Sequence, residues 1–177
     1  PIQVNGAQPG DVVAITFLDF HPSGWGWTAN IPGFGLLAED FPEPALHLWT
    51  YETNLTKPAA FSTIGQVPLK PFVGTIGLAL ADPGRHSVVP PRQVGGNMDI
   101  RDNCKGTTLY LPCEVPGALL SLGDTHAAQG DGEVCGTAIE SPMKVEIKVN
   151  LIKNAQISYP RLETTEAVTK HRATSKT

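Results

Sequence analysis

The sequence predicts an all-β fold, a β-sandwich with long loops and little helix. The 177 residues include 18 glycines and 16 prolines, which favours short strands joined by tight turns over long helices. Apolar and polar residues alternate through 107–115 and 143–151, as expected of strands with one face on a core and the other in water. The run 12–20 is almost wholly apolar, which indicates a buried strand.

The remaining elements rest on shorter signals. Residues 21–35 are rich in Gly, Pro and Trp, and they predict a long loop that covers another part of the molecule. Prolines just upstream limit a modest helical pattern to a turn or two within 45–49. Short strands are expected at 73–79 and 118–122.

The chain is long enough for one sizeable domain, because a chain of this size buries about 70% of its unfolded surface. We expect residues 1–155 to form the β-sandwich core. Beyond that point apolar residues become sparse and Thr, Lys and Glu dominate, so 156–177 is expected to be a loosely ordered C-terminal tail.

Charge and cysteine usage narrow the class of protein. The net charge is −4 and the sequence has no basic block, which argues against a nucleic-acid surface. No apolar run approaches the roughly 20 residues that a membrane-spanning helix needs. The three cysteines, Cys104, Cys113 and Cys135, are odd in number and widely spaced, so we expect no disulfide scaffold and a cytoplasmic location.

Titratable residues and glycines concentrate in two segments, 95–101 and 123–140. Asp124 and His126 stand two apart where a strand leads into a loop, so both side chains can face one ion. Zinc and related ions accept this mixture of oxygen and nitrogen. The candidates for contacting a substrate or its oxyanion are Gln129, Asn97 and the backbone amides near Gly130 and Gly132.

Plainer interpretations compete with a metal site. Asp124 could cap a turn, and His126 could be an ordinary hydrogen-bonded loop histidine. Asp99 and Arg101 could form a surface ion pair of little consequence. Cys135 could act as a nucleophile paired with His126, although a free cysteine is more often a small buried apolar residue.

Long stretches of the sequence resemble the acetamidase/formamidase family. The stretches are GWGWTANIPGFGLLAEDFPEP (24–44), PPR (90–92), GGNMDIR (95–101) and GTTLYLPCEVPGALLSLGDTHAAQGDGEVCGTAIE (106–140). Motifs of this length are far more specific than a single short pattern. The resemblance implies a jelly-roll type of β-sandwich and hydrolysis of the C–N bond of a small amide such as formamide, acetamide or a cyclic γ-lactam.

The resemblance also implies a divalent metal, zinc by preference, and a set of site residues. The matching positions are Asp99, Asp124, His126, Glu133 and Glu140. We expect Asp99 and His126 to be metal ligands, with Asp124 as a third ligand or as the orienter of His126. Glu140 or Glu133 is expected to carry the proton, so the catalytic candidates are Glu140, Glu133 and Asp124.

Members of the family are considerably longer than this chain. A homo-oligomer, or an assembly with the missing part of the enzyme, is therefore expected. Two other functions fit the same residues: a non-catalytic β-sandwich that binds a metal or small ligand, and a cysteine hydrolase that uses Cys135. The preferred hypothesis is a metal-dependent amidohydrolase.

Overall fold

The computed structural model describes residues 1–164 and 168–170, which form strands and loops without any helix, whereas the sequence predicts little helix. Within these ranges there is accordingly no helix long and apolar enough to cross a membrane. The strands are β1 (Val12–Pro22), β2 (Trp25–Asn30), β3 (Ala45–Thr50), β4 (Ala59–Phe61), β5 (Gly65–Val67), β6 (Phe72–Gly77), β7 (Gly95–Asn97), β8 (Thr108–Pro112), β9 (Ser121–His126), β10 (Met143–Ile152), β11 (Arg161–Glu163) and β12 (Val168–Lys170).

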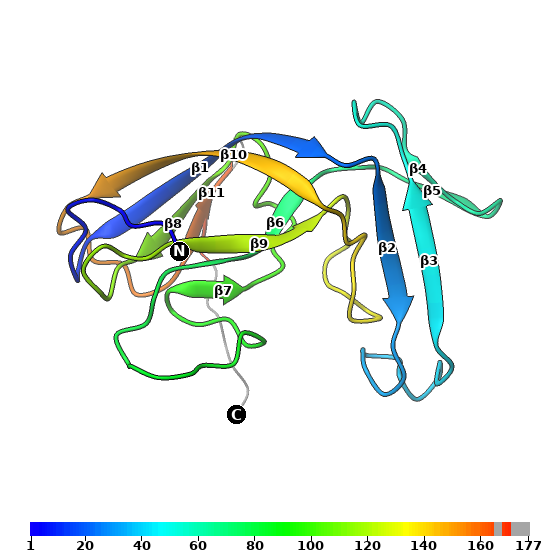
Figure 1. Cartoon of the computed structure of the whole chain (residues 1–177), viewed down its shortest axis with the longest axis horizontal. Helices are drawn as coiled ribbons and strands as arrows, with labels where there is room; N and C mark the ends of the chain where they lie inside the picture. The colour runs from blue at the N-terminus through cyan, green and yellow to red at the C-terminus, as the bar shows by residue number, and fades with distance from the viewer. Residues whose placement is uncertain (165–167, 171–177) are drawn as a thin grey trace.

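Two antiparallel sheets enclose the main core (Figure 1). One sheet has the strand order β10-β1-β8-β11-β12, and the other has the order β7-β6-β9. Apolar side chains from both sheets form a single buried cluster that includes Ile15, Phe17, Ile76, Leu109 and Leu120. Burial of such side chains is the main source of stability, at roughly 1.5–3 kcal/mol for each. This arrangement confirms the all-β prediction.

The alternating segments are strands where the sequence predicts them. The long strand β1 lies between β10 and β8 and pairs with both in antiparallel register. Strand β1 is buried along most of its length, and above all in its first half, whereas β10 consists of half-buried and exposed residues. The difference follows from position, because β1 is interior to the sheet and β10 is its edge strand.

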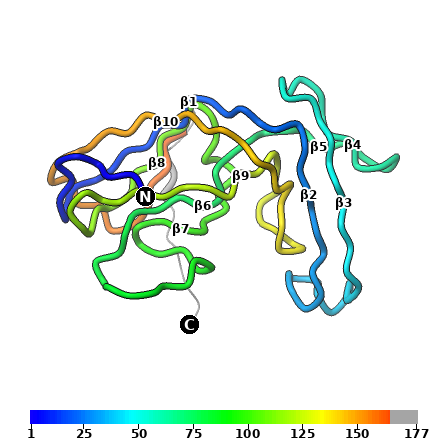
Figure 2. Tube along the Cα trace, in the orientation of Figure 1, coloured from blue at the N-terminus to red at the C-terminus, as the bar shows by residue number. Residues whose placement is uncertain are grey.

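An arm formed by β2 and β3 extends away from the sandwich (Figure 1). Figure 2 follows the trace from β1 directly into this hairpin. The inner side of the arm is held by a second, smaller apolar cluster: Trp49, Tyr51, Ala59, Ala127, Ala128 and Ile139. The cluster therefore packs the arm against residues that follow the end of β9.

Two local predictions are wrong, and they share one cause. Residues 25–30 of the expected loop form β2, and the expected helical turn at 45–49 lies in β3. Each of these strands takes its hydrogen bonds from the other, from Trp25 opposite Thr50 to Asn30 opposite Ala45. Strand pairing across an intervening loop cannot be detected in the local pattern of apolar residues. The tertiary contacts therefore override the local preference for a loop or a helical turn. The strand expected at 118–122 begins instead at Ser121.

The boundary expected at residue 155 does not coincide with the end of the sheet. Strand β11 pairs with β8, and Leu162 is completely buried in the main core. A single apolar residue between polar neighbours is enough to dock a short strand, although the sequence pattern around it is weak. The remainder of the expected tail, 165–167 and 171–177, lies outside the described residues.

A buried carboxylate ties the start of β1 to the end of β10. Asp11 is 2% exposed and accepts hydrogen bonds from Lys153 Nζ at 2.5 Å and from the backbone amides of Asn154 at 3.0 Å and Gln8 at 2.9 Å. The hydrogen bond from Lys153, followed by that from Asn154, lowers the pKa of Asp11 below 3.8. These contacts favour the ionised form.

We expect Asp11→Asn to lower the melting temperature at pH 7. Because folding lowers the pKa of Asp11, its contribution is present above the unfolded pKa and is lost as the pH falls through the folded value. The difference in melting temperature between variant and parent should therefore narrow when thermal unfolding is followed by circular dichroism at pH 3. Asp40→Asn, at an exposed loop carboxylate, is the matched control and should leave both curves unchanged. An equal difference at both pH values would contradict the assignment.

Candidate active site

The site is built at the end of β9, where that strand pairs with β6. Asp124 and His126 project to the same side of β9, and His126 Nε2 lies 3.1 Å from Asp124 Oδ1. This confirms the geometric part of the sequence argument, that residues two apart on a strand share a face. The register pairs Val73 with Thr125 and Thr75 with Gly123, so Gly74 lies directly opposite Asp124.

Gly74 leaves the space that the site carboxylates occupy. A Cβ at this position would lie 2.6 Å from Asp99 Oδ1 and 2.9 Å from both the carbonyl oxygen and Oδ2 of Asp124. Asp99 and Asp124 themselves have positive φ angles, 47° and 57°. Such backbone costs of order 1 kcal/mol or more and concentrates at functional sites. Strained aspartates facing a glycine are the first indication that this is a binding centre.

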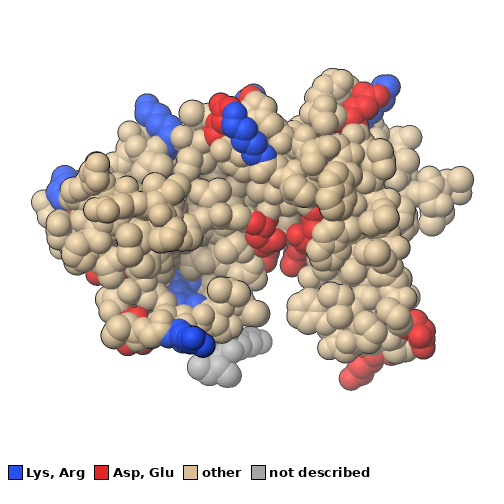
Figure 3. Space-filling model, in the orientation of Figure 1, with Lys and Arg blue, Asp and Glu red and all other residues tan. Residues whose placement is uncertain are grey.

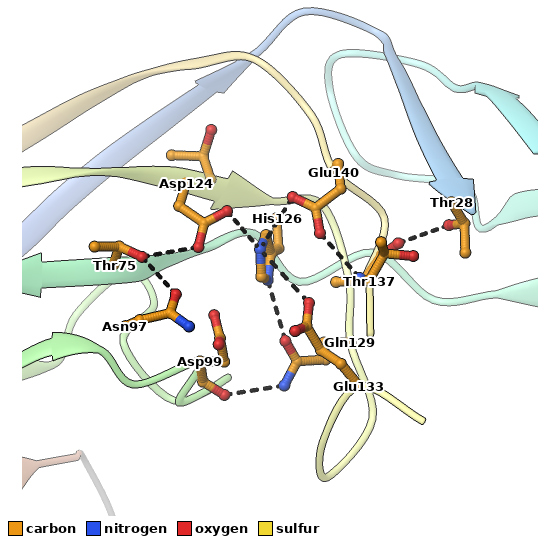
Figure 4. Close-up of polar contacts among 12 residues, drawn as sticks. Thr28, Thr75, Asn97, Asp99, Asp124, His126, Gln129, Glu133, Thr137 and Glu140 are labelled. Atoms are coloured by element: carbon orange, nitrogen blue, oxygen red, sulfur yellow. Dashed lines mark hydrogen bonds and ion pairs between the residues drawn. The ribbon is translucent and has the colours of Figure 1, made fainter. Parts of the chain in front are cut away.

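His126 lies at the middle of the site and is only 1% exposed (Figure 4). Its Nε2 is 3.2 Å from Glu140 Oε2 and 4.0 Å from Glu133 Oε1, in addition to its contact with Asp124. On the other side of the ring, Nδ1 lies 3.1 Å from Gln129 Oε1. Phe72 packs edge-on against the ring, with the centroids 4.8 Å apart. The imidazole is therefore held on every side.

Glu140 reaches the site through backbone pairing with the arm. Its amide and carbonyl exchange hydrogen bonds of 2.9 Å with the backbone of Trp27, and its Oε1 accepts the amide of Ala138 at 3.0 Å. The close approach requires glycine in β2, because a Cβ on Gly26 would lie 2.7 Å from the Glu140 carbonyl oxygen. The arm, which the sequence did not predict, thus positions one of the site carboxylates.

Burial and mutual charge shift several pKa values. Burial opposes the charged form of His126, but hydrogen bonds and charge from Asp124 and Glu140 outweigh it and raise the pKa of His126 to about 10. Burial, followed by the charge of Asp99, raises the pKa of Glu133 to about 7. Burial also raises the pKa of Asp99, against the effect of His126. The hydrogen bond with His126 lowers the pKa of Asp124.

The donor atoms are spaced as cation ligands require. Asp99, His126 and Glu133 form one set, and Asp124, His126 and Glu140 form another, with ligand atoms within 4.8 Å of one another in each set. Asp99 Oδ1 is buried and has no hydrogen-bond partner in the described structure. A buried carboxylate oxygen without a partner is costly, and a cation at this point would satisfy it. The residues therefore fit a divalent metal ion.

The residues expected to contact substrate are engaged with the protein. Gln129 donates its Nε2 hydrogen to the Asp99 carbonyl at 2.9 Å, so its Oε1 must accept from His126 Nδ1. Asn97 Oδ1 lies 2.8 Å from the Thr75 hydroxyl, and its Nδ2 donates to the Val89 carbonyl at 3.1 Å. Gly130 lines a cavity of about 680 Å³ whose wall contains none of the four site carboxylates. Gln129 thus commits Nδ1 of His126 to donating a hydrogen bond, which the sequence did not reveal.

Two plainer interpretations receive no support from the geometry. Arg101 pairs with Asp131 at 3.0 Å instead of with Asp99. The Cys135 thiol contacts Thr137, and His126 directs both ring nitrogens to Gln129 and the carboxylates, which leaves neither for that thiol. A cysteine–histidine pair is therefore not formed.

Sequence reasoning missed Gly74, Thr75 and the part played by the arm. The Thr75 hydroxyl lies 2.9 Å from Asp124 Oδ2 and supports that carboxylate from β6. The only available signal was the glycine within the apolar strand at 73–79, which often marks close approach by a ligand or another chain segment. In the space-filling view, acidic side chains gather at a notch between the sandwich and the arm (Figure 3).

Comparison with known proteins identifies relatives along almost the whole chain. A family profile described as the Acetamidase/Formamidase family matches residues 1–83 and 79–174. An acetamidase from Mycolicibacterium smegmatis is 31% identical, with 90% of this chain and 54% of the relative covered. A formamidase from Methylophilus methylotrophus is 34% identical, with 90% and 52% covered.

Solved structures agree with these sequence relatives. An acetamidase from Bacillus halodurans superimposes with a TM-score of 0.85 at 40% identity, with 93% of this chain and 54% of that chain covered. A gamma lactamase from Delftia acidovorans superimposes with a TM-score of 0.79 at 26% identity, with 94% and 55% covered. The chain therefore spans about half the length of its relatives.

Proposed function

Because this chain belongs to the acetamidase/formamidase family, we propose that it carries the catalytic centre of an amidohydrolase that cleaves the C–N bond of small amides. The observation that carries the proposal is that two sets of potential ligands, Asp99 with Glu133 and Asp124 with Glu140, share one buried imidazole, that of His126, and that Asp99 Oδ1 has no hydrogen-bond partner. Relatives named as acetamidase, formamidase and gamma lactamase support amide hydrolysis as the chemistry.

The reaction needs three chemical functions. Water attacks the amide carbon, a C–O bond forms, the C–N bond breaks, and the products are a carboxylate and ammonium, or an amino acid when the amide is cyclic. The attacking water must lose a proton, the carbonyl must be polarised, and the departing nitrogen must gain a proton. A site that meets all three must combine a positive centre with a carboxylate that exchanges protons near neutral pH.

Asp99 and His126 would hold a divalent metal ion, with Asp124 as the third ligand; Asp99 and Asp124 come from the two different ligand sets that share His126. A bound divalent ion would lower the pKa of a water and polarise the carbonyl. Asp99 would offer its unsatisfied Oδ1, and His126 would offer Nε2 because its Nδ1–H is committed to Gln129. One imidazole with carboxylates is a donor set that zinc accepts, so zinc is the ion we propose.

Glu133 is the proposed proton carrier. Its pKa of about 7 lets it accept a proton from the attacking water and return it to the leaving nitrogen at neutral pH. It also lies farther from His126 Nε2 than Asp124 and Glu140 do, at 4.0 Å. Glu140 is anchored through Ala138 and the backbone of Trp27, so we assign it to orienting His126.

One assay tests both the activity and its metal dependence. Ammonia release from formamide and acetamide, and ring opening of a γ-lactam, are measured with this chain before chelation, after chelation and after zinc is restored. We expect hydrolysis of at least one amide, its loss on chelation and its recovery with zinc. Thermal unfolding with and without zinc provides a readout that does not depend on turnover, since a ligand of the folded state raises the melting temperature.

The outcomes separate the competing functions. Zinc-dependent stabilisation without hydrolysis of any amide would indicate a non-catalytic metal-binding sandwich. Hydrolysis that survives chelation but is lost on treatment with a thiol reagent would indicate a cysteine hydrolase and would overturn the assignment. Hydrolysis that neither treatment affects would remove the metal from the mechanism.

A further inference from the structure

An apolar cleft opens beside Asp124, one of the four carboxylates of the site. Its volume is about 720 Å³, and Thr75, Asn97 and Asp124 supply the polar part of its wall on the side of the site, while His86, Ser87, Arg92 and Ser121 are polar residues elsewhere on the wall. Most of the rest is apolar, with Leu78, Leu80, Val88, Val89, Val94 and Leu122 among the lining residues. The other large cavity, of about 680 Å³, is lined by Lys70 and Arg101 and by none of the site carboxylates. Asp124 therefore belongs both to the site and to the wall of the apolar cleft.

The segment that joins β6 to β7 forms one wall of this cleft and is held in place by polar contacts. Asn97 Nδ2 donates to the Val89 carbonyl at 3.1 Å, and the Arg92 guanidinium donates to the Ser87 carbonyl at 2.7 Å. The side chains of Val88 and Val89 are nevertheless 77% and 67% exposed. An organised backbone that presents unburied valines at the edge of a cleft is typical of a wall that binds an apolar ligand.

The cleft has more space than the acyl group of the smallest amides fills. A two-carbon acyl group occupies about as much space as two or three water molecules, on the order of 100 Å³. The cleft is several times larger and falls within the roughly 300–1,000 Å³ range of pockets that bind larger organic ligands. The excess volume is lined by apolar side chains, which indicates a hydrocarbon occupant.

We propose that this cleft takes the apolar acyl chain of the amide, so that the substrate class is amides of medium-length or aryl-substituted carboxylic acids, with the amide group at Asp124. The proposal rests on the amidohydrolase function proposed above and specifies its substrate. The amide carbonyl and nitrogen would lie at the carboxylate cluster, while the chain would extend along Leu122 and Val89 toward Leu80.

A homologous series of amides tests the substrate class. The values of kcat/KM are measured for acetamide, butyramide, hexanamide and phenylacetamide with the zinc-loaded chain. Burial of each additional methylene should raise kcat/KM about fourfold until the cleft is filled. A flat or falling series with measurable acetamide hydrolysis would overturn this proposal and leave the amidohydrolase function intact. Absence of hydrolysis across the whole series would instead reject the amidohydrolase function.

Variants in the exposed wall test whether the dependence of kcat/KM on chain length arises from the cleft. The double variant Val88→Asn, Val89→Asn changes two exposed side chains and should fold normally, which circular dichroism verifies. It should reduce the ratio of kcat/KM for hexanamide to kcat/KM for acetamide at least fourfold. Ile64→Asn, at a residue that is 79% exposed on the β4–β5 turn, is the matched control. Leu122→Asn changes a second lining residue of the cleft. If the ratio of kcat/KM for hexanamide to kcat/KM for acetamide stays at the parent value in both the double variant and Leu122→Asn, the proposal is wrong.

Discussion

His126→Gln is expected to lower kcat/KM for amide hydrolysis by about 1,000-fold or more. The reason is that His126 is the one imidazole that both sets of potential ligands share, and its Nε2 lies 3.1 Å from Asp124 Oδ1 and 3.2 Å from Glu140 Oε2. A bound divalent ion contributes several kcal/mol to stabilising the transition state, and each 1.36 kcal/mol corresponds to about tenfold in rate. Steady-state ammonia release measures this loss, and the zinc-dependent rise in melting temperature should disappear with it.

Two variants accompany the His126 experiment. His21→Gln replaces an exposed histidine that contacts Glu146, so it should leave both readouts unchanged. Gln129→Leu removes the acceptor of the Nδ1 hydrogen, and a loss of about 10–100-fold is expected, as for other residues that orient a metal ligand. If His126→Gln retains a tenth of the parent activity and still binds zinc, the central role of His126 is wrong.

Gly74→Ala is expected to lower kcat/KM about 100-fold while the chain remains folded. The added Cβ would lie 2.6 Å from Asp99 Oδ1 and 2.9 Å from two atoms of Asp124, so the carboxylates must move apart. Displacement of reacting groups by about 1 Å is enough for a loss of this size. Zinc affinity, measured by competition with a chromophoric chelator, should fall in parallel.

The control for Gly74 is Gly65→Ala in β5, where a Cβ would meet nothing within 4 Å. This variant should match the parent in activity, zinc affinity and melting temperature. If Gly74→Ala also matched the parent in all three, the two carboxylates could not share one binding point at the observed spacing. A fall in melting temperature of Gly74→Ala alone, with activity and zinc affinity preserved, would assign this glycine to folding.

Much of the site was accessible from local sequence patterns. Alternation over 107–115 and 143–151 identified two strands, because side chains two apart face the same side of a sheet. The same spacing placed Asp124 and His126 together. The resemblance to one family added Asp99, Glu133 and Glu140, each of which the structure places in a ligand set with His126. Their individual roles remain predictions.

Local sequence patterns and the family resemblance were thus sufficient to predict the all-β class, the longer strands and the titratable residues of the site. They did not predict the arm formed by β2 and β3, the anchoring of Glu140 on that arm or the docking of β11 in the main sheet. Tertiary structure decided these features, and it also decided that Gln129 orients His126 and that Gly74 makes room for Asp124. The physical reason is that facing within a strand depends on neighbours two residues apart, whereas these contacts join segments whose proximity only the folded chain creates.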